Sequence, residues 1–186
     1  MPLISRFFLS LSRYRVKAGV PAAVLVLFFS RPNALCLGTG LAVCVLGLVL
    51  RGWAAGHLHK DSRLTTTGPY RFSRNPLYLA NFILGIGLLI AANSLACWAV
   101  FFAYFLLFYP ATIQMEREKM AMLFPEQYEE YGRRVPLFFP SLRHLRNPDS
   151  QKFQLSLYLK NKEYRALAAV LGFWLLLFFR FLWLKS

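Results

Sequence analysis

Residues 77–109 read LYLANFILGIGLLIAANSLACWAVFFAYFLLFY, and this stretch decides the fold. It consists of two apolar runs, 77–92 and 95–109, separated only by Asn93 and Ser94. Apolar runs of roughly 20 residues are typical of helices that cross the hydrocarbon core of a bilayer, and asparagine and serine favour turns. The stretch therefore predicts two membrane helices joined by a tight hairpin.

Three further apolar blocks lie at 20–29, 34–50 and 166–184. With 57% hydrophobic residues and 17% aromatic residues in 186, the chain has more apolar surface than a soluble domain of this length can cover. We therefore expect an all-α, polytopic integral membrane protein with about five transmembrane helices, a helical hairpin and a cytoplasmic insertion.

The chain is expected to form a single membrane-embedded domain over residues 1–186. Its expected parts are the N-terminal spans 1–56, a motif-bearing core 57–140, and an interfacial segment with the last span 141–186.

The first apolar block is short and contains Pro21. Because Arg13, Arg15 and Lys17 precede it, an N-terminal signal peptide is an alternative interpretation. No clear small-residue cleavage site follows Phe29, which favours a membrane helix.

The formal net charge is +14, and the basic residues gather in regions 6–17, 60–74 and 117–162. If five helices alternate across the membrane, all three regions lie on one side. This is the distribution expected of cytoplasmic loops. We therefore predict a cytoplasmic N-terminus and cytoplasmic motif loops, with the C-terminus on the other side, and no nucleic-acid partner, because no recognition motif accompanies the charge.

Cysteine and histidine residues give little sign of a metal site. All three cysteines lie inside apolar blocks, which is typical of packing residues. His57 and His59 are two positions apart and would point in different directions on a helix, and His144 has no nearby residue of ligand type. No metal is expected.

A long polar insertion, residues 116–162, separates the hairpin from the last apolar block. Apolar and aromatic residues recur at helical spacing from Glu116 to Tyr131, but proline inside a helix costs about 3 kcal/mol. We therefore expect one helix to end near Leu123 and another to begin at Pro125. Residues 135–140 predict an extended segment, and residues 141–164 are either a segment on the membrane surface that shapes the entrance to a ligand site or a simple amphipathic connector.

Residues 68–78 read GPYRFSRNPLY and join a basic loop to an apolar run. Two arginines, two tyrosines, one asparagine and two prolines in eleven residues exceed what a connection needs, which indicates a ligand site. Glu116 and Glu118 follow the second run of the hairpin at the same membrane face. They either pair with Arg117 and Lys119 at a wet helix end, or one of them meets Arg74 or a cationic ligand.

An ordered set of motifs resembles the isoprenylcysteine carboxyl methyltransferase and phospholipid methyltransferase superfamily. The motifs are GPYR at 68–71, RNPLY at 74–78, Glu116, FPEQYEEY at 124–131 and RVP at 134–136. The resemblance covers about residues 40–140. It implies a small integral-membrane enzyme that uses S-adenosylmethionine.

The chain departs from the family pattern at four positions. Asn75 stands where the family usually has histidine, Ala80 and Pro125 stand in place of glycines, and Arg117 replaces the second glutamate of a pair. We therefore expect Asn75 to serve binding and geometry and to carry no proton.

The resemblance implies a cofactor site whose residue types match S-adenosylmethionine. A carboxylate such as Glu116 can face its ammonium or ribose hydroxyls, Arg74 can hold its carboxylate through a forked pair of hydrogen bonds, and tyrosines can face adenine or the sulfonium. The expected cofactor-binding residues are Gly68, Pro69, Tyr70, Arg74, Asn75, Pro76, Tyr78, Glu116, Tyr128 and Tyr131.

Arg74 and Glu118 are the expected catalytic residues. An amine acceptor must lose a proton, for which Glu118 is the nearest candidate base, whereas a carboxylate acceptor is already ionised. The sequence thus predicts methyl transfer from S-adenosylmethionine to a hydrophobic or lipid-like acceptor, a prenylcysteine carboxylate or a phospholipid amine being the two family examples.

Two alternatives remain open from the sequence. One is a membrane reductase of the sterol type that uses NADPH, and the other is a non-catalytic membrane protein whose motif residues stabilise loops. Besides the bilayer and the acceptor, the sequence predicts no partner and no particular oligomeric state.

Overall fold

The structure is a computed structural model that describes residues 3–141 and 151–185, with the backbone alone over residues 3–13. All regular elements in this part of the chain are helices, which confirms the all-α prediction. They are α1 (Leu3–Phe29), α2 (Ala34–Ala55), the 3₁₀ helix η1 (Gly68–Arg71), α3 (Pro76–Ala92), α4 (Leu95–Leu123), α5 (Pro125–Arg134), α6 (Leu155–Lys160) and α7 (Tyr164–Lys185).

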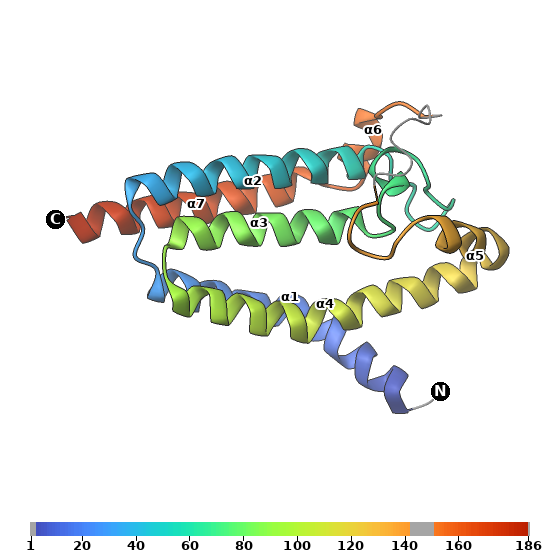
Figure 1. Cartoon of the computed structure of the whole chain (residues 1–186), viewed down its shortest axis with the longest axis horizontal. Coiled ribbons are helices and arrows are strands. Elements are labelled where there is room, and N and C mark those ends of the chain that lie inside the picture. Colours follow the sequence, from blue (N-terminus) through green and yellow to red (C-terminus); the bar gives the residue numbers. More distant parts are fainter. Residues whose placement is uncertain (1–2, 142–150, 186) are drawn as a thin grey trace.

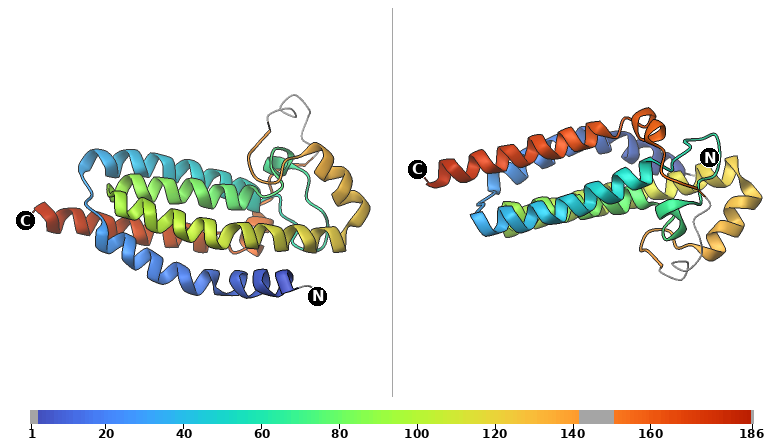
Figure 2. Two further views of the ribbon diagram at one scale, coloured as in Figure 1. Left: turned by 60° about the horizontal axis from the view of Figure 1, so that its bottom comes forward. Right: turned by 90° about the horizontal axis from the view of Figure 1, so that it is seen from above.

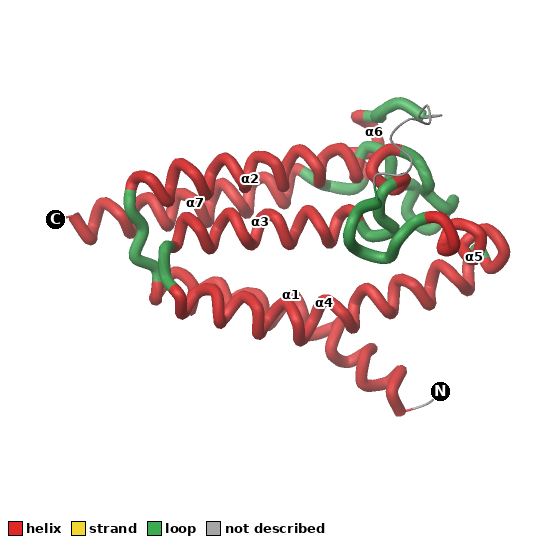
Figure 3. The backbone as a smooth tube through the Cα atoms, in the orientation of Figure 1, coloured by secondary structure: helices red, strands yellow, loops and turns green. Residues whose placement is uncertain are grey.

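The five long helices α1, α2, α3, α4 and α7 lie side by side and alternate in direction (Figures 1 and 2). The N-terminus, the α2–α3 connection and α5 gather at one end, which we call the loop end. The α1–α2 connection, the α3–α4 turn and the C-terminus lie at the opposite end (Figure 3). The predicted basic loops therefore share one end of the bundle.

Three helices, α2, α4 and α7, are long and apolar enough to cross a bilayer, and α3 is a shorter apolar helix of 17 residues. The chain is therefore a polytopic membrane protein. Helix α1 continues through Pro21 and is 27 residues long, more than the apolar block 20–29 suggested. The number of spans, about five, stays a prediction.

Small residues let α2 and α3 approach closely. A Cβ atom added at Gly40 would lie 2.5 Å from the carbonyl oxygen of Gly87, and one added at Gly87 would lie 2.7 Å from Sγ of Cys44. Close backbone approach at small residues is a common means of helix association in membranes, where apolar burial gives little driving force. This pairing holds α2 and α3 alongside each other, closest in the half of the pair away from the loop end.

The predicted hairpin is confirmed at Asn93. This residue adopts the left-handed conformation (φ 50°, ψ 49°), and its backbone N–H donates to the carbonyls of Leu89 and Ile90. Asparagine tolerates this conformation better than most residues. Its side-chain Nδ2 also donates to the Arg31 carbonyl at 3.0 Å, which ties the turn to the α1–α2 connection.

The predicted break in the polar insertion is also confirmed. Helix α4 ends at Leu123 and α5 begins at Pro125, where proline occupies the first helical turn and loses no intrahelical hydrogen bond. The part of the tail at residues 142–150 lies outside the described residues. From Gln154, whose N–H donates to the Gly56 carbonyl, the tail packs against the end of α2.

Candidate functional site

A cavity of about 370 Å³ lies at the loop end, and we call it the inner cavity. It is bordered by the ends of α2, α3 and α4, by α5, and by the loop that connects α2 to α3. Eight of the ten residues predicted to bind a cofactor line it. They are Tyr70, Arg74, Asn75, Pro76, Tyr78, Glu116, Tyr128 and Tyr131.

Gly68 and Pro69 do not line the inner cavity but shape the loop that carries Tyr70. Gly68 has φ +58°, and a Cβ atom there would lie 2.6 Å from the His57 ring. Only glycine adopts this conformation readily while leaving room for the imidazole. Pro69 is fully buried at the start of η1. Both residues therefore act on the site through the backbone.

Segment 135–140, predicted to be extended, instead bends at Val135 and at residues 137–139, and it is hydrogen-bonded to the motif loop. The Arg74 N–H donates to the Pro136 carbonyl at 2.9 Å, and Ser73 Oγ donates to the Phe138 carbonyl at 2.7 Å. Asn75 Nδ2 donates to the Leu137 carbonyl at 2.9 Å, and Asn75 is buried. The amide at the position where the resemblance expects histidine thus binds the backbone of the second motif.

Helix α5 is anchored to the same loop by Tyr131. Its hydroxyl donates to the Tyr70 carbonyl at 2.6 Å, and both tyrosines are buried. Burial raises the pKa of both hydroxyls far above the ordinary value of tyrosine, so both stay protonated at neutral pH. The Tyr128 ring lies 6.2 Å from the Tyr131 ring, edge to face, and completes an aromatic wall.

Arg74 is half-buried between this wall and the cavity. Its guanidinium carbon lies 5.4 Å from the centre of the Tyr128 ring, and Gly132 leaves space for it, since a Cβ atom there would lie 3.0 Å from Nη1. Buried Nε has no hydrogen-bond partner in the part of the chain that the structure describes. Such atoms are rare in folded proteins without a ligand or water.

Glu116 is half-buried and lines the inner cavity. Among the described residues it forms no ion pair. Lys119, one of its two expected partners at a wet helix end, instead pairs with Asp61 at 2.5 Å. The carboxylate is therefore available to a cationic group that enters the cavity.

Glu118 lies elsewhere. It is exposed on α4, accepts a hydrogen bond from Gln114 Nε2 at 2.9 Å, and does not line the inner cavity. Its expected role as a base stays a prediction. In that role, the Glu118 side chain would have to reach an acceptor from outside the inner cavity.

Several cavity residues were not predicted from the sequence. Arg15 lies over the Tyr78 ring, with 5.5 Å between its guanidinium carbon and the ring centre. Arg51 donates to Asn81 Oδ1 and forms an ion pair with Glu163. These side chains come from α1, α2, α3 and the turn before α7, outside the recognisable motifs. One sequence signal could have identified the helical residues among them: charged and polar residues within membrane helices are rare and usually functional.

His59 also lines the inner cavity, and sequence reasoning gave it no role. Burial lowers its pKa, and the neighbouring cations Arg63 and Lys160 lower it further. The imidazole is therefore neutral at neutral pH. Its buried Nε2 has no hydrogen-bond partner among the described residues, so it can donate to or accept from a ligand.

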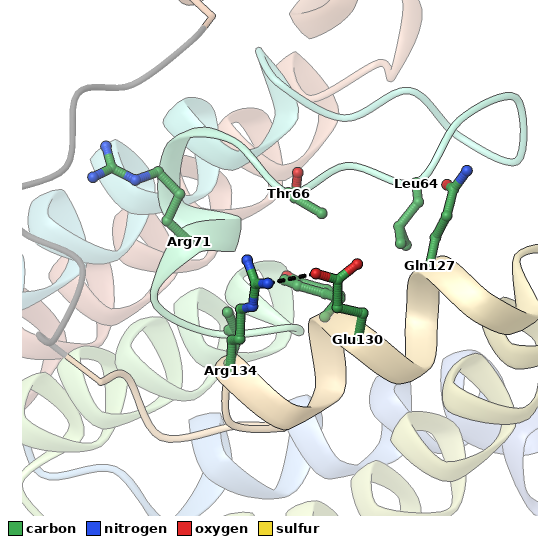
Figure 4. Close-up of a pocket in the computed structure, with 8 residues that line it drawn as sticks. Leu64, Thr66, Arg71, Gln127, Glu130 and Arg134 are labelled. Carbon is green, nitrogen blue, oxygen red and sulfur yellow. Dashed lines mark hydrogen bonds and ion pairs between the residues drawn. The ribbon is translucent and has the colours of Figure 1, made fainter.

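A second cavity of about 420 Å³, the outer cavity, lies between α5 and the α2–α3 connection (Figure 4). Leu64, Thr66 and Arg71 contribute from the connection, whereas Gln127, Glu130 and Arg134 contribute from α5. Arg134 and Glu130 form an ion pair across one helical turn. Leu64 and Tyr131 line both cavities, so the two are neighbours with a common wall.

The inner cavity fits a ligand that carries both charges and an aromatic ring. It offers a carboxylate, tyrosine faces and a guanidinium whose Nε has no hydrogen-bond partner among the described residues. Its volume lies within the range of about 300–1,000 Å³ typical of ligand pockets. S-adenosylmethionine has these features. No group of three His, Cys, Asp or Glu side chains in the described chain could hold a metal ion.

Comparison with protein families gives one match, to the phospholipid methyltransferase family over residues 35–127. Two bacterial relatives are similar over 131 residues. The cobalt-zinc-cadmium resistance protein CzcN of Cupriavidus metallidurans is 38% identical, and the nickel-cobalt-cadmium resistance protein NccN of Alcaligenes xylosoxydans xylosoxydans is 34% identical. The matched part is 69% of this chain and 60% and 61% of theirs.

The protein-S-isoprenylcysteine O-methyltransferase of Schizosaccharomyces pombe is 28% identical over 109 residues, which are 57% of this chain and 46% of that protein. No solved structure matches. The chain thus spans less than two thirds of the length of these relatives. The family match contains the motif loop, the hairpin and Glu116, but ends before Tyr128.

Proposed function

Because the chain belongs to the phospholipid methyltransferase family, we propose that it transfers a methyl group from S-adenosylmethionine to a hydrophobic or lipid-like acceptor. The family match and the apolar helices both support a membrane methyltransferase. The observation that carries the cofactor proposal is the inner cavity, where eight predicted binding residues from separate motifs meet.

Glu116 and Arg74 are proposed to orient the amino-acid end of the cofactor. Glu116 accepts from the ammonium, and Arg74 donates to the carboxylate through Nε and one terminal nitrogen, the forked geometry that arginine alone provides. Nε of Arg74 has no hydrogen-bond partner within residues 3–141 and 151–185 as the structure describes them, which supports this role. Tyr70, Tyr78, Tyr128 and Tyr131 line the remaining wall, where ring faces favour a cation by about 0.5–2 kcal/mol.

The bound cofactor supplies a methyl group activated by positive charge on its sulfur. The protein must place an acceptor atom in line with this methyl group at roughly 3–3.5 Å, and this alignment can supply much of the rate acceleration. Asn75, bonded to the Leu137 carbonyl, holds the two motif halves in register and carries no proton in this scheme. Glu118 is proposed as a base only for an amine acceptor.

The orientation in the membrane is part of the proposal. The loop end, with the basic α2–α3 connection and α5, faces the cytoplasm, so the water-soluble cofactor enters from that side. The acceptor, which is lipid-soluble, reaches the site from the bilayer.

The names of two relatives refer to resistance to cobalt, zinc, nickel or cadmium. Metal resistance is stated for those two proteins, and it forms no part of the function proposed for this chain. The sequence also left open an NADPH-dependent reductase. This alternative requires a different ligand, so a binding measurement distinguishes it from a methyltransferase.

The test is a titration of the purified protein in detergent with S-adenosylhomocysteine and, separately, with NADPH. A ligand at 100 times its Kd stabilises the folded state by about 2.7 kcal/mol, so calorimetry and thermal unfolding both report it. We expect binding of S-adenosylhomocysteine alone. Binding of NADPH instead would favour the reductase, and binding of neither would favour a non-catalytic protein.

A further inference from the structure

A buried ion pair lies in the inner cavity outside the cofactor motifs. Arg51, in the last turns of α2, contacts Glu163 through Nε, and its Nη2 lies 3.4 Å from the second carboxylate oxygen. Arg51 Nη1 also donates to Asn81 on α3. Glu163 is only 7% exposed. Burying two charges is costly even when they pair, so a pair of this kind is weak evidence for stability and calls for another explanation.

The turn before α7 is built to place Glu163. Asn161 Nδ2 donates to the Ala55 and Leu58 carbonyls, both at 3.0 Å, which fixes the turn to the end of α2. Lys162 then adopts the left-handed conformation with φ 55°. A residue with a side chain pays strain for this conformation, and such strain collects at functional sites. The backbone thus directs Glu163 toward Arg51.

The pair stands where polar and apolar surfaces meet. Both residues line the inner cavity together with Arg74 and Tyr78. Glu163 also lines a smaller groove of about 220 Å³ between α2 and α7, two helices that lie alongside each other in Figure 1. The other groove residues are Val45, Leu48, Val49, Tyr158 and Leu167. Glu163 is the one residue common to the two linings.

Charge selects the kind of head group. The inner cavity is lined by the five cations Arg15, Arg51, Lys60, Arg63 and Arg74, against three anions, Asp61, Glu116 and Glu163. A cofactor with a positive sulfur adds to this excess. An anionic acceptor lowers the electrostatic energy of the loaded site, whereas a protonated amine raises it.

We propose that Arg51 binds the anionic head of an amphiphilic methyl acceptor whose hydrocarbon lies in the groove between α2 and α7. Glu163 holds Arg51 in position until the head of the acceptor takes the place of the Glu163 carboxylate. This inference rests on the proposed methyl transfer. An oxygen of the acceptor head forms a bond to the methyl carbon of S-adenosylmethionine as the bond between that carbon and sulfur breaks. The electrons of the broken bond pass to sulfur, which becomes the neutral thioether of S-adenosylhomocysteine. The acceptor head loses its charge in this step, so Arg51 returns to Glu163 and the product is released.

The experiment measures binding of dodecanoate and dodecylamine, two probes with the same hydrocarbon and opposite charges, to the full-length protein in nanodiscs. Wild type is expected to bind dodecanoate more tightly than dodecylamine. Arg51→Gln should weaken dodecanoate binding by about tenfold or more, the loss expected for a charge-assisted hydrogen bond. Glu163→Gln should leave dodecanoate binding unchanged or make it tighter, because the competing carboxylate is gone.

Arg63→Gln is the matched control, since it removes the same charge from an exposed lining residue and should change dodecanoate binding much less. The double variant Arg51→Gln/Glu163→Gln leaves neither partner of the ion pair buried with an unpaired charge. It replaces the single Arg51 variant in the binding measurement if that variant does not fold. It should show the same weakened binding.

Wild-type dodecanoate affinity in a folded Arg51 variant would overturn the inference, as would tighter binding of dodecylamine or no binding of either probe by wild type. A purely structural ion pair predicts that both single variants lose binding together. Affinity for S-adenosylhomocysteine is measured in parallel and should be unchanged in all these variants. If the wild-type protein does not bind S-adenosylhomocysteine, the proposed function is contradicted. Dodecanoate binding tests the acceptor site separately.

Discussion

Glu116 and Glu118 are two positions apart on α4, so they point in different directions from one helix. The first faces the inner cavity without an ion pair among the described residues, and the second is exposed and bonded to Gln114. The same substitution at the two positions therefore separates a role in the cavity from a general effect of charge at the helix end.

We predict that Glu116→Gln weakens binding of S-adenosylhomocysteine by about tenfold, because a charge-assisted hydrogen bond is worth about 1.5–3 kcal/mol. Glu118→Gln should bind it as wild type does. Isothermal titration of both variants in detergent checks this, with thermal unfolding as the control for folding. Equal affinities in the two variants would remove Glu116 from the cofactor site. Turnover of an amine acceptor by the Glu118 variant tests its role as a base.

Arg74 gives a second test at this scale. Arg74→Lys keeps the positive charge but loses the planar fork and the stacking on Tyr128, which lies 5.4 Å away. We expect S-adenosylhomocysteine affinity and turnover to fall by about tenfold in a folded variant. Methylation assays with labelled cofactor and lipid extract measure the turnover. Unimpaired affinity and activity would mean that the forked geometry of Arg74 is not needed for cofactor binding or turnover.

At the scale of elements, the motif loop depends on a glycine that does not line the inner cavity. Gly68 holds φ +58° against the His57 ring, and this lets η1 present Tyr70 to Tyr131 on α5. The loop, α5 and the segment 135–140 therefore form one hydrogen-bonded unit. Distortion at Gly68 reaches the cavity through Tyr70.

We predict that Gly68→Ala lowers the free energy of unfolding by more than about 1 kcal/mol, because alanine is strained at positive φ and its methyl group would meet the imidazole. Gly38→Ala is the control, since a Cβ atom there meets nothing within 4 Å and alanine favours a helix. Thermal unfolding in one detergent should show a lower midpoint for the first variant only. Equal midpoints would mean that the loop adjusts freely.

The sequence predicted these elements well where a local signal existed. Asn93 marks the hairpin, and Pro125 marks the break between α4 and α5, because turn and proline chemistry act over a few residues. Of the residues that line the inner cavity, the sequence predicted only those that belong to the motifs. Arg51 and Glu163 are 112 residues apart, and only the packing of α7 beside α2 brings them together, so no local pattern could reveal the pair.

For the whole molecule, the alternating helices place the N-terminus and basic loops at one end and the C-terminus at the other (Figure 1). If α1 crosses the membrane, Arg31 and Lys185 share the outer side, whereas Lys60 and the N-terminus are cytoplasmic. All three side chains are exposed, so single cysteines at these positions, in a background where the three natural cysteines are replaced, report their side.

We predict that a membrane-impermeant maleimide labels Arg31→Cys and Lys185→Cys in intact cells, and Lys60→Cys only after the membrane is opened. An N-terminal epitope should likewise need an opened membrane. An N-terminal epitope found outside together with Arg31→Cys would mean that α1 lies along the surface and that four helices cross. Lys60→Cys labelled in intact cells would place the inner cavity away from the cytoplasm, where the cofactor is made, and would contradict the proposed entry route.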